Sequence, residues 1–137
     1  MPTTQSAALI AKSIMPGYTV NDLDRSIAFY EALGFTVKER WEENGKLLGV
    51  MVQAGQQQLG LNQDDWKKGR DRQKGIGTRL HIETLQNIDD IAARVKAAGF
   101  KLDVEPFDTP FKTRQFEVTD PSGFKLTISS EWPSSWS

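Results

Sequence analysis

The sequence contains no cysteine among its 137 residues. This absence excludes disulfide bonds, thiolate metal sites and a cysteine nucleophile, and it fits a reducing compartment such as the cytoplasm, where we expect the protein to act. Long apolar runs are also missing. No stretch of about 18 apolar residues exists to span a membrane, so we expect no membrane association. The opening residues, MPTTQSAALIAK, do not combine a basic start with an apolar segment, so we predict no signal peptide.

The chain also lacks an excess of charge of either sign. It carries 17 Lys and Arg against 18 Asp and Glu, so the basic excess typical of nucleic-acid-binding proteins is absent. Hydrophobic residues make up 38% and charged residues 26%, which is the balance of a globular protein. We therefore predict a single soluble domain that does not bind nucleic acid.

Two segments of the chain share one pattern. The first is MPGYTVNDLDRSIAFYEALGF at residues 15–35, and the second is RLHIETLQNIDDIAARVKAAGF at residues 79–100. Their helical parts align without a gap at an offset of 65 residues, which places Leu23 on Ile88, Gly34 on Gly99 and Phe35 on Phe100. Such an internal repeat predicts a duplicated strand–helix module.

The first module is expected to follow a βαβββ plan over residues 12–63. Asn21 has the side chain of a helix cap, apolar residues recur after it at helical spacing, and Gly34 is suited to end the helix. Asn44-Gly45 is typical of a tight hairpin turn. The expected elements are a helix at 23–33 and strands at 12–20, 36–43, 46–54 and 57–63.

The second module, residues 77–130, is expected to repeat this plan. Asn87 is its helix cap, Gly99 ends the helix, and Asp120-Pro121-Ser122-Gly123 has the composition of a type I turn. The expected elements are a helix at 88–98 and strands at 78–84, 100–105, 113–119 and 124–130. The predicted domain thus spans residues 12–130. The tail beyond it carries Trp132 and Trp136, which would cover either a core edge or a partner subunit.

The connector between the modules, residues 64–76, has two interpretations. Its five basic residues lie among three acidic ones, with Trp66 near its start. It is either a solvated linker, or a mobile, slightly cationic flap that Trp66 latches onto the domain.

The run VNDLDRSIAFYEALGF resembles a signature of the vicinal oxygen chelate superfamily, and TDPSGFKLTI is similar to the ending of that family's domain. The superfamily includes glyoxalase I, bleomycin-resistance proteins, extradiol dioxygenases and fosfomycin-resistance enzymes. The resemblance implies an α+β fold in which two βαβββ modules form a curved, cup-like mixed sheet with the helices outside. It also implies a ligand or metal in the cup, and a homodimer.

Catalytic members of the family hold a divalent metal at four positions. The resemblance carries these positions onto Met15, Gly60, Arg79 and Thr127, with Leu80 replacing Arg79 if module two is aligned without an insertion. None of these side chains is an imidazole or a carboxylate, so they do not form a hard divalent-metal site. We therefore expect no metal, no cofactor and no metal-dependent glyoxalase I activity.

Side chains alternate across a strand, so the residues that turn away from the helices should line the cup. The expected ligand-binding residues lie on several strands, with two aromatic residues near the mouth: Met51, Gln58, Arg79, His81, Glu83, Glu117, Trp41 and Phe111.

Two of these cup residues have alternative roles. Arg79 would hold a carboxylate or phosphate, or form an internal ion pair with Glu117 or Glu83. His81, the single histidine, would be a hydrogen-bonded strand residue, a general base, or a ligand of a displaced metal with Glu83 and Glu117.

Two functions are consistent with these observations. The first is a metal-free small-molecule-binding protein of the glyoxalase or bleomycin-resistance type that binds a polar aromatic or anionic ligand in the cup. The second is a glyoxalase-like lyase, isomerase or dioxygenase-like enzyme with its metal displaced toward His81, Glu83 and Glu117. The catalytic residues of such an enzyme are not identified by the sequence.

Overall fold

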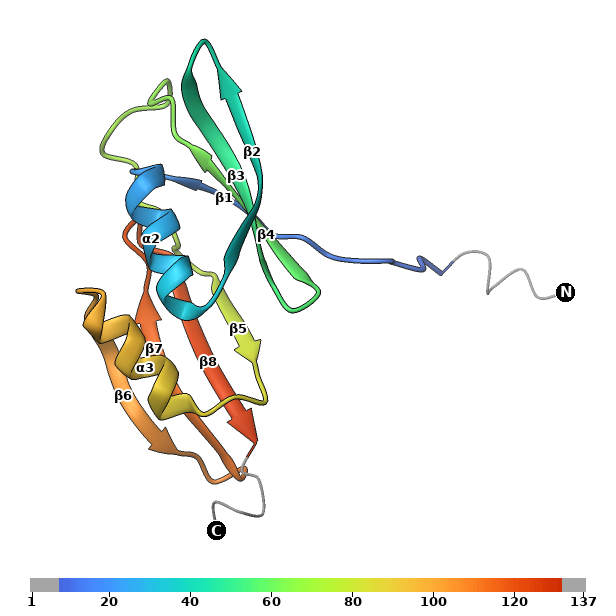
Figure 1. Ribbon diagram of the computed structural model, residues 1–137, viewed down its shortest axis with the longest axis vertical. Helices are drawn as coiled ribbons and strands as arrows, with labels where there is room; N and C mark the ends of the chain where they lie inside the picture. The colour runs from blue at the N-terminus through green and yellow to red at the C-terminus, as the bar shows by residue number, and fades with distance from the viewer. Residues whose placement is uncertain (1–7, 132–137) are drawn as a thin grey trace, which may run out of the picture.

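The structure, a computed structural model, describes residues 8–131 and contains two similar units (Figure 1). The tail tryptophans, Trp132 and Trp136, lie outside the described residues. The first unit has one helix and four strands, which form a sheet in the order β1-β4-β3-β2. These elements are β1 (Gly17–Val20), α2 (Leu23–Leu33), β2 (Thr36–Glu43), β3 (Lys46–Ala54) and β4 (Gln57–Gln63).

The second unit repeats the first, element by element. Its sheet has the order β5-β8-β7-β6, so in both units the first strand pairs in parallel with the last. Its elements are β5 (Arg79–Glu83), α3 (Ile88–Ala97), β6 (Leu102–Asp108), β7 (Thr113–Thr119) and β8 (Lys125–Glu131). This arrangement confirms the α+β fold of two βαβββ modules.

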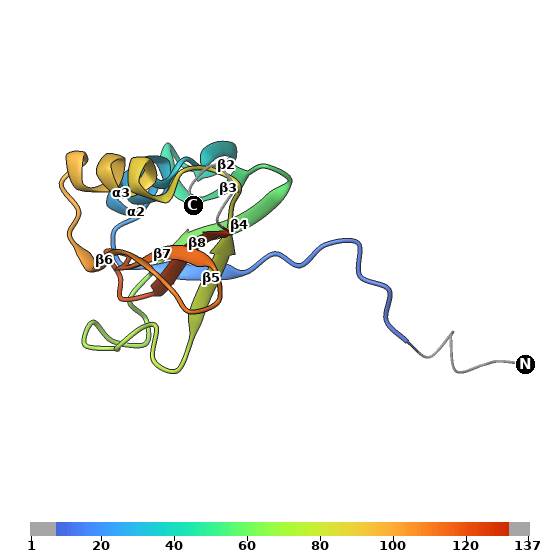
Figure 2. The same cartoon turned by 90° about the horizontal axis from the view of Figure 1, so that it is seen from below.

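The two helices lie on one side of the sheets and leave the other face uncovered (Figure 2). The hydrogen bonds of residues 8–131 define two four-stranded mixed sheets, one in each module. The helices have 11 and 10 residues, and no helix in the described part of the chain is long and apolar enough to cross a membrane.

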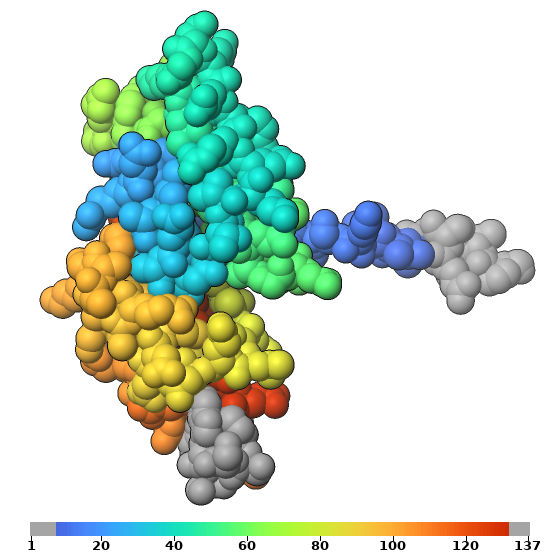
Figure 3. Space-filling model, in the orientation of Figure 1, coloured from blue at the N-terminus to red at the C-terminus, as the bar shows by residue number. Residues whose placement is uncertain are grey.

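The first strand is much shorter than predicted. We expected a strand at 12–20, but β1 begins at Gly17, which pairs with Gly60 of β4. The Pro16 carbonyl still accepts a hydrogen bond from the Gly60 amide, at 2.9 Å, but the chain before Ile14 runs away from the domain (Figures 1 and 3). Because β1 stops there, the first half of β4 has an uncovered edge.

The helix cap of the first module is one residue later than predicted. The Asp22 side chain accepts a hydrogen bond from the Arg25 amide at 3.2 Å and forms the cap, while the Asn21 amide donates to Ser122 Oγ at 2.8 Å. The predicted Asn87 cap is confirmed by its contact with the Asp90 amide. The hairpin turn is confirmed too, since Asn44 and Gly45 both have positive φ angles, 54° and 77°.

The core lies between each sheet and its helix and continues from one module to the other. Phe29 and Tyr30 of α2 are fully buried. The Phe29 ring packs edge-on against Tyr30, with centroids 5.0 Å apart, and against Phe100 of the second module, at 5.1 Å. Arg94 of α3 donates to the Leu33 carbonyl at the end of α2, at 3.0 Å. The aromatic residues Phe29, Tyr30 and Phe100 are therefore packing residues.

A buried carboxylate joins the two modules. Asp120, in the turn before β8, is 3% exposed and accepts a hydrogen bond from the Tyr30 hydroxyl at 2.8 Å. Its other oxygen accepts from the amides of Ser122, Gly123 and Phe124 at 2.9–3.0 Å. Burial and the neighbouring carboxylate raise the pKa of Tyr30 far above its ordinary value, so its hydroxyl remains a donor.

A buried ion pair joins the two ends of the connector, whereas most of the residues between them are exposed to solvent. The Asp64 carboxylate lies 2.8 Å from Lys74 Nζ, and both side chains are only 5% exposed. Trp66 packs under two cations, with Lys74 Nζ 4.8 Å and the Arg70 guanidinium 4.9 Å from its ring. Gly75 then passes so close to the Gly123 carbonyl that any side chain at that position would collide with it.

We predict that Tyr30→Phe lowers the free energy of unfolding by about 1–3 kcal/mol, because it leaves one oxygen of a buried carboxylate without its donor. Urea denaturation should show a lower midpoint at an unchanged slope. The matched control is Tyr18→Phe, which keeps the stacking of this ring on Phe124 at 4.0 Å. Equal effects of the two substitutions would contradict the role given to Asp120.

A second prediction concerns acid stability. The hydrogen bonds from the Lys74 side chain and the Trp66 amide lower the pKa of Asp64 below its ordinary value. A lowered pKa in the folded state contributes stability above the unfolded-state pKa, and that contribution is lost as the pH falls through the folded-state value. Asp64→Asn should therefore lower the melting temperature by several degrees at neutral pH and by less near pH 3. An equal loss at both pH values would contradict this assignment.

Candidate functional site

The uncovered face of the second sheet carries an ion pair. Arg79 Nη1 lies 3.4 Å from Glu117 Oε1 and donates to Thr127 Oγ1 at 3.1 Å. The Arg79 and Glu117 side chains are 41% and 27% exposed, so the pair is partly solvated and contributes little to stability. Of the alternatives for Arg79, the structure shows the internal ion pair with Glu117.

His81 lies two residues further along β5 on the same face. Its Nε2 is 2.9 Å from Ser129 Oγ, which matches the interpretation as a hydrogen-bonded strand histidine. The alternative of a displaced metal site at His81, Glu83 and Glu117 finds no support in the geometry of the described residues. No three His, Asp or Glu side chains within residues 8–131 come together in a way that could hold a metal ion. The Glu117 carboxylate instead forms an ion pair with Arg79.

The four positions that correspond to metal ligands in the family lie in two pairs, one in each module. A Cβ placed on Gly60 would lie 3.9 Å from the Met15 methyl group, and Arg79 is hydrogen-bonded to Thr127. At these positions Met15 offers a thioether, Gly60 has no side chain, and Arg79 and Thr127 carry a guanidinium and a hydroxyl. A cationic guanidinium repels a metal ion, and the other groups are poor ligands for a hard divalent metal, so these residues do not fit one.

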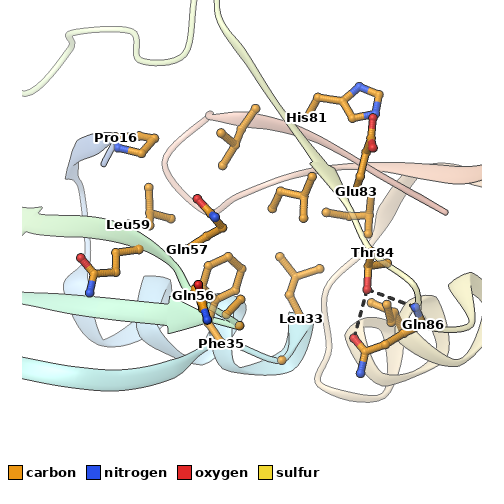
Figure 4. A pocket seen from close by; sticks show the side chains of 18 of the residues that line it. Pro16, Leu33, Phe35, Gln56, Gln57, Leu59, His81, Glu83, Thr84 and Gln86 are labelled. Atoms are coloured by element: carbon orange, nitrogen blue, oxygen red, sulfur yellow. Dashed lines mark hydrogen bonds between the residues drawn. The ribbon is translucent and has the colours of Figure 1, made fainter. Parts of the chain in front are cut away.

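A pocket lies between the modules, where the uncovered edge of β4 faces the edge strand β5 (Figure 4). Its volume is about 960 Å³, which is at the upper end of the range for small-molecule sites. The floor is apolar and is formed by residues of both modules: Leu33, Phe35, Leu59, Ile91 and Ile128. The rim is polar and carries Gln56, Gln57, Gln58, His81, Glu83, Thr84 and Gln86.

The pocket brings together only part of the predicted site. Gln58, His81 and Glu83 are in its lining, whereas Arg79 and Glu117 are not among the lining residues. The remaining predicted residues lie elsewhere: Met51 is buried in β3, Trp41 faces Gly49 from β2, and Phe111 is 84% exposed beyond β6.

The pocket floor is the part that sequence analysis missed. Leu80 and Ile82 are partly buried against the core, but they also line the pocket because β5 is an edge strand. Pro16 was the residue of the sequence that indicated where the edge of β4 becomes uncovered. Proline has no backbone N–H to donate to a neighbouring strand, and β1, the strand beside β4, begins directly after it.

The arrangement favours recognition of one kind of molecule. The apolar floor can bury a ring or an alkyl group, and the amide, imidazole and hydroxyl groups of the rim can orient polar substituents. Glu83 is the single acidic residue among the lining residues, and neither Arg nor Lys lines the pocket. The pocket therefore complements a neutral or cationic polar group better than an anion.

The sequence itself places the protein in a family. A model of the Glyoxalase/Bleomycin resistance protein/Dioxygenase superfamily matches residues 12–128. The chain belongs to this superfamily. Membership confirms the resemblance carried by the two sequence motifs, and it agrees with the duplicated βαβββ modules of the structure. No curated protein matches the sequence significantly.

Solved structures of the superfamily have the same fold. A superfamily member from Sphaerobacter thermophilus is 23% identical, with a TM-score of 0.67 over 89% of this chain and 98% of that one. A hypothetical protein from S. aureus is 21% identical, with a TM-score of 0.69 over 88% and 95% of the two chains. Lactoylglutathione lyase from Agrobacterium tumefaciens is 19% identical, with a TM-score of 0.62 over 88% and 95%. At these identities the likeness concerns the fold alone.

We predict that manganese, zinc and nickel leave the melting temperature unchanged, because the residues at the superfamily's metal positions do not fit a metal. A metal present at about 100 times its dissociation constant would stabilise the protein by roughly 2.7 kcal/mol, which a thermal shift reveals. Metal analysis of protein purified without chelator is the second measurement. A stoichiometric metal that disappears in His81→Ala would contradict the prediction.

Proposed function

We propose that this protein is a small-molecule-binding protein that acts in the cytoplasm as a homodimer and needs no metal. Its ligand has an apolar, aromatic body with polar substituents and lies in the pocket between the modules. The observation that carries the proposal is the pocket itself, with an apolar floor drawn from both modules and a rim of hydrogen-bonding side chains.

Binding without catalysis is favoured by the chemistry of the lining residues. Covalent catalysis needs a nucleophile beside a base, and acid–base catalysis needs a group whose proton affinity suits the reaction. His81 is held by Ser129, and the Thr84 hydroxyl is near Gln86 Oε1, at 3.4 Å. The Ser129 hydroxyl is buried, at 4% exposure, and is not among the pocket-lining residues, so His81 does not present it as a nucleophile to a ligand in the pocket. Thr84 has an amide oxygen, and no base, as its neighbour.

A neutral or cationic ligand is favoured over an anionic one. The Arg79 guanidinium, the best anion-binding group of the predicted cup, is already paired with Glu117 and is not in the pocket lining. Glu83 brings a negative charge to the rim, so a cationic substituent would gain a partner there, whereas a carboxylate would be repelled.

The proposal predicts that a bulky residue at the pocket mouth blocks ligand binding. Gln57 is exposed on the uncovered edge of β4 and lines the pocket, so Gln57→Trp should fill space there without changing the core (Figure 4). Affinity for an aromatic compound found by thermal shift should fall by about tenfold or more. The screen should contain neutral and cationic aromatic compounds, aromatic acids, glutathione conjugates and glycopeptide antibiotics.

The matched control is Glu43→Trp, which places the same side chain on an exposed position at the far end of β2. The free energy of unfolding of both variants should equal that of the natural protein to within about 0.5 kcal/mol, as is usual for surface substitutions. Equal affinity of the natural protein and Gln57→Trp for every compound that binds would show that the pocket is not the site. Turnover of a glutathione thiohemiacetal with any of the three metals would contradict the proposed function.

A further inference from the structure

The last described strand ends beside the pocket. β5 and β8 are parallel neighbours, and Glu83 of β5 pairs with Ser129 of β8 (Figure 1). The Thr84 amide, one residue further along, donates a hydrogen bond to the Ser129 carbonyl at 2.9 Å. Glu83 and Thr84 both line the pocket, and β8 ends at Glu131, two residues after Ser129. The chain that follows β8 therefore starts next to the pocket mouth.

The sequence that follows β8 is rich in tryptophan and has no charged side chain. Residues 132–137, WPSSWS, which we call the tail, contain Trp132 and Trp136 and no Asp, Glu, Lys or Arg. Tryptophan gains more than most residues from burial, and its indole N–H needs an acceptor when it is buried. Burying these side chains desolvates no charge. The tail therefore suits a surface that is apolar and offers hydrogen-bond acceptors at its rim.

The pocket has both of these features. Its floor is apolar, and its volume of about 960 Å³ is large enough for a ring system. Glu83 and Gln57 lie at the rim, where their side-chain oxygens can accept a hydrogen bond from an indole N–H (Figure 4). Leu85, at the mouth, is 96% exposed, so it has apolar surface that the described residues leave uncovered.

We propose that the tail folds over Leu85 and places the Trp136 indole in the pocket of its own chain, where it competes with the ligand. Trp132 packs on Leu85 at the mouth. The docking of the tail does not depend on ligand binding, but the competition rests on the function proposed above. The tail is then an internal inhibitor, which the ligand displaces.

The tail is long enough for this path. Neighbouring strands lie about 4.8 Å apart, so crossing from β8 past β5 to the space beyond takes about 10 Å. Trp136 is five residues after Glu131, and five extended residues span roughly 17 Å. Trp132 directly follows β8 and does not reach across, so the two tryptophans take different positions.

The register of β8 directs Trp132 toward the helix side of the sheet. Ile128 belongs to the core and to the pocket floor on that side. Trp132 is four residues after Ile128, so a strand continued by one residue would place both side chains on the same face. Pro133 favours this direction, because the residue before a proline prefers an extended conformation.

The covalent attachment of the tail makes even a weak contact sufficient. A short flexible linker gives an effective concentration on the order of 1 mM, so a contact with a dissociation constant of about 0.1 mM would be formed about nine-tenths of the time. A ligand then finds an open pocket in about one-tenth of the molecules, and its apparent affinity is about tenfold weaker. At micromolar protein, the tail of a second copy is present at only about a thousandth of this effective concentration. The tail of the same chain is therefore the favoured occupant.

The absence of cysteine allows a direct test by disulfide trapping in the full chain. One variant carries Ser135→Cys and Gln57→Cys, which would join the tail to the wall of the pocket that the first module provides. The control carries Ser135→Cys and Phe111→Cys. Phe111 is 84% exposed and lies two residues before Thr113, the sheet partner of Glu131, so it is near the start of the tail.

We expect the Gln57 pair to form a disulfide within one chain at least about fivefold faster than the Phe111 pair, because docking raises the effective concentration of the tail at the pocket. Equal rates would overturn the proposal, since a tail without a preferred position also meets the residue near its start. A disulfide-linked dimer as the main product of the Gln57 pair would overturn it too, because the occupant would be a second copy.

Ligand affinity tests the competition. Trp136→Ser should bind an aromatic compound from the screen about tenfold more tightly than the natural protein does, because its pocket is open. Trp41→Ser is the matched control, since Trp41 belongs to β2 and is not among the pocket-lining residues, and its affinity should equal that of the natural protein. An unchanged affinity in Trp136→Ser would overturn the competition.

The two proposals fail in different ways. If Gln57→Trp blocks ligand binding but the Gln57 pair shows no preference over the Phe111 pair, the proposed function stands and the docking of the tail is wrong. If the Gln57 pair forms its disulfide faster but no compound binds any variant, the tail docks, whereas the proposed function and the competition are both wrong.

Discussion

The Asp120 carboxylate is the contact on which the arrangement of the two modules depends. One oxygen binds the Tyr30 hydroxyl of the first module, and the other organises the turn that leads into the last strand of the second. A buried carboxylate is tolerated only with its donors in place, so the relative position of the modules is strongly constrained. That position sets the separation between β4 and β5, and hence the width of the pocket.

The residues that mark the superfamily in the sequence therefore serve the architecture. Tyr30 and Asp120 belong to the two motifs that carry the family resemblance, and both are buried at the module junction. The positions that would hold a metal have diverged: Arg79 and Thr127 now form a hydrogen bond in which the guanidinium provides the positive charge. A chain of this kind keeps the fold of its superfamily while its site is free to change.

Most of the fold was predictable, because its signals are local. Helical spacing, Gly34 and the Asn44-Gly45 turn specify elements through nearby residues, and β2, β3 and β4 have the predicted bounds. The site was only partly predictable, because it depends on how the modules meet. Alternation along β5 placed His81 and Glu83 on one face correctly, but it did not reveal that Leu80 and Ile82, on the opposite face, also reach the pocket. The buried Asp64–Lys74 pair likewise needs the folded connector, since composition alone suggested a solvated segment.

The parallel pairing of the first and last strands in each module has a consequence for synthesis on the ribosome. β5 cannot gain its neighbour until β8 has left the exit tunnel, so the second module cannot close before all of its strands have been synthesised. The Tyr30 hydroxyl cannot form its hydrogen bond until Asp120, five residues before that strand, has also left the tunnel. Until then the apolar face of α2 is incompletely covered, and the nascent chain is most exposed to aggregation during this interval.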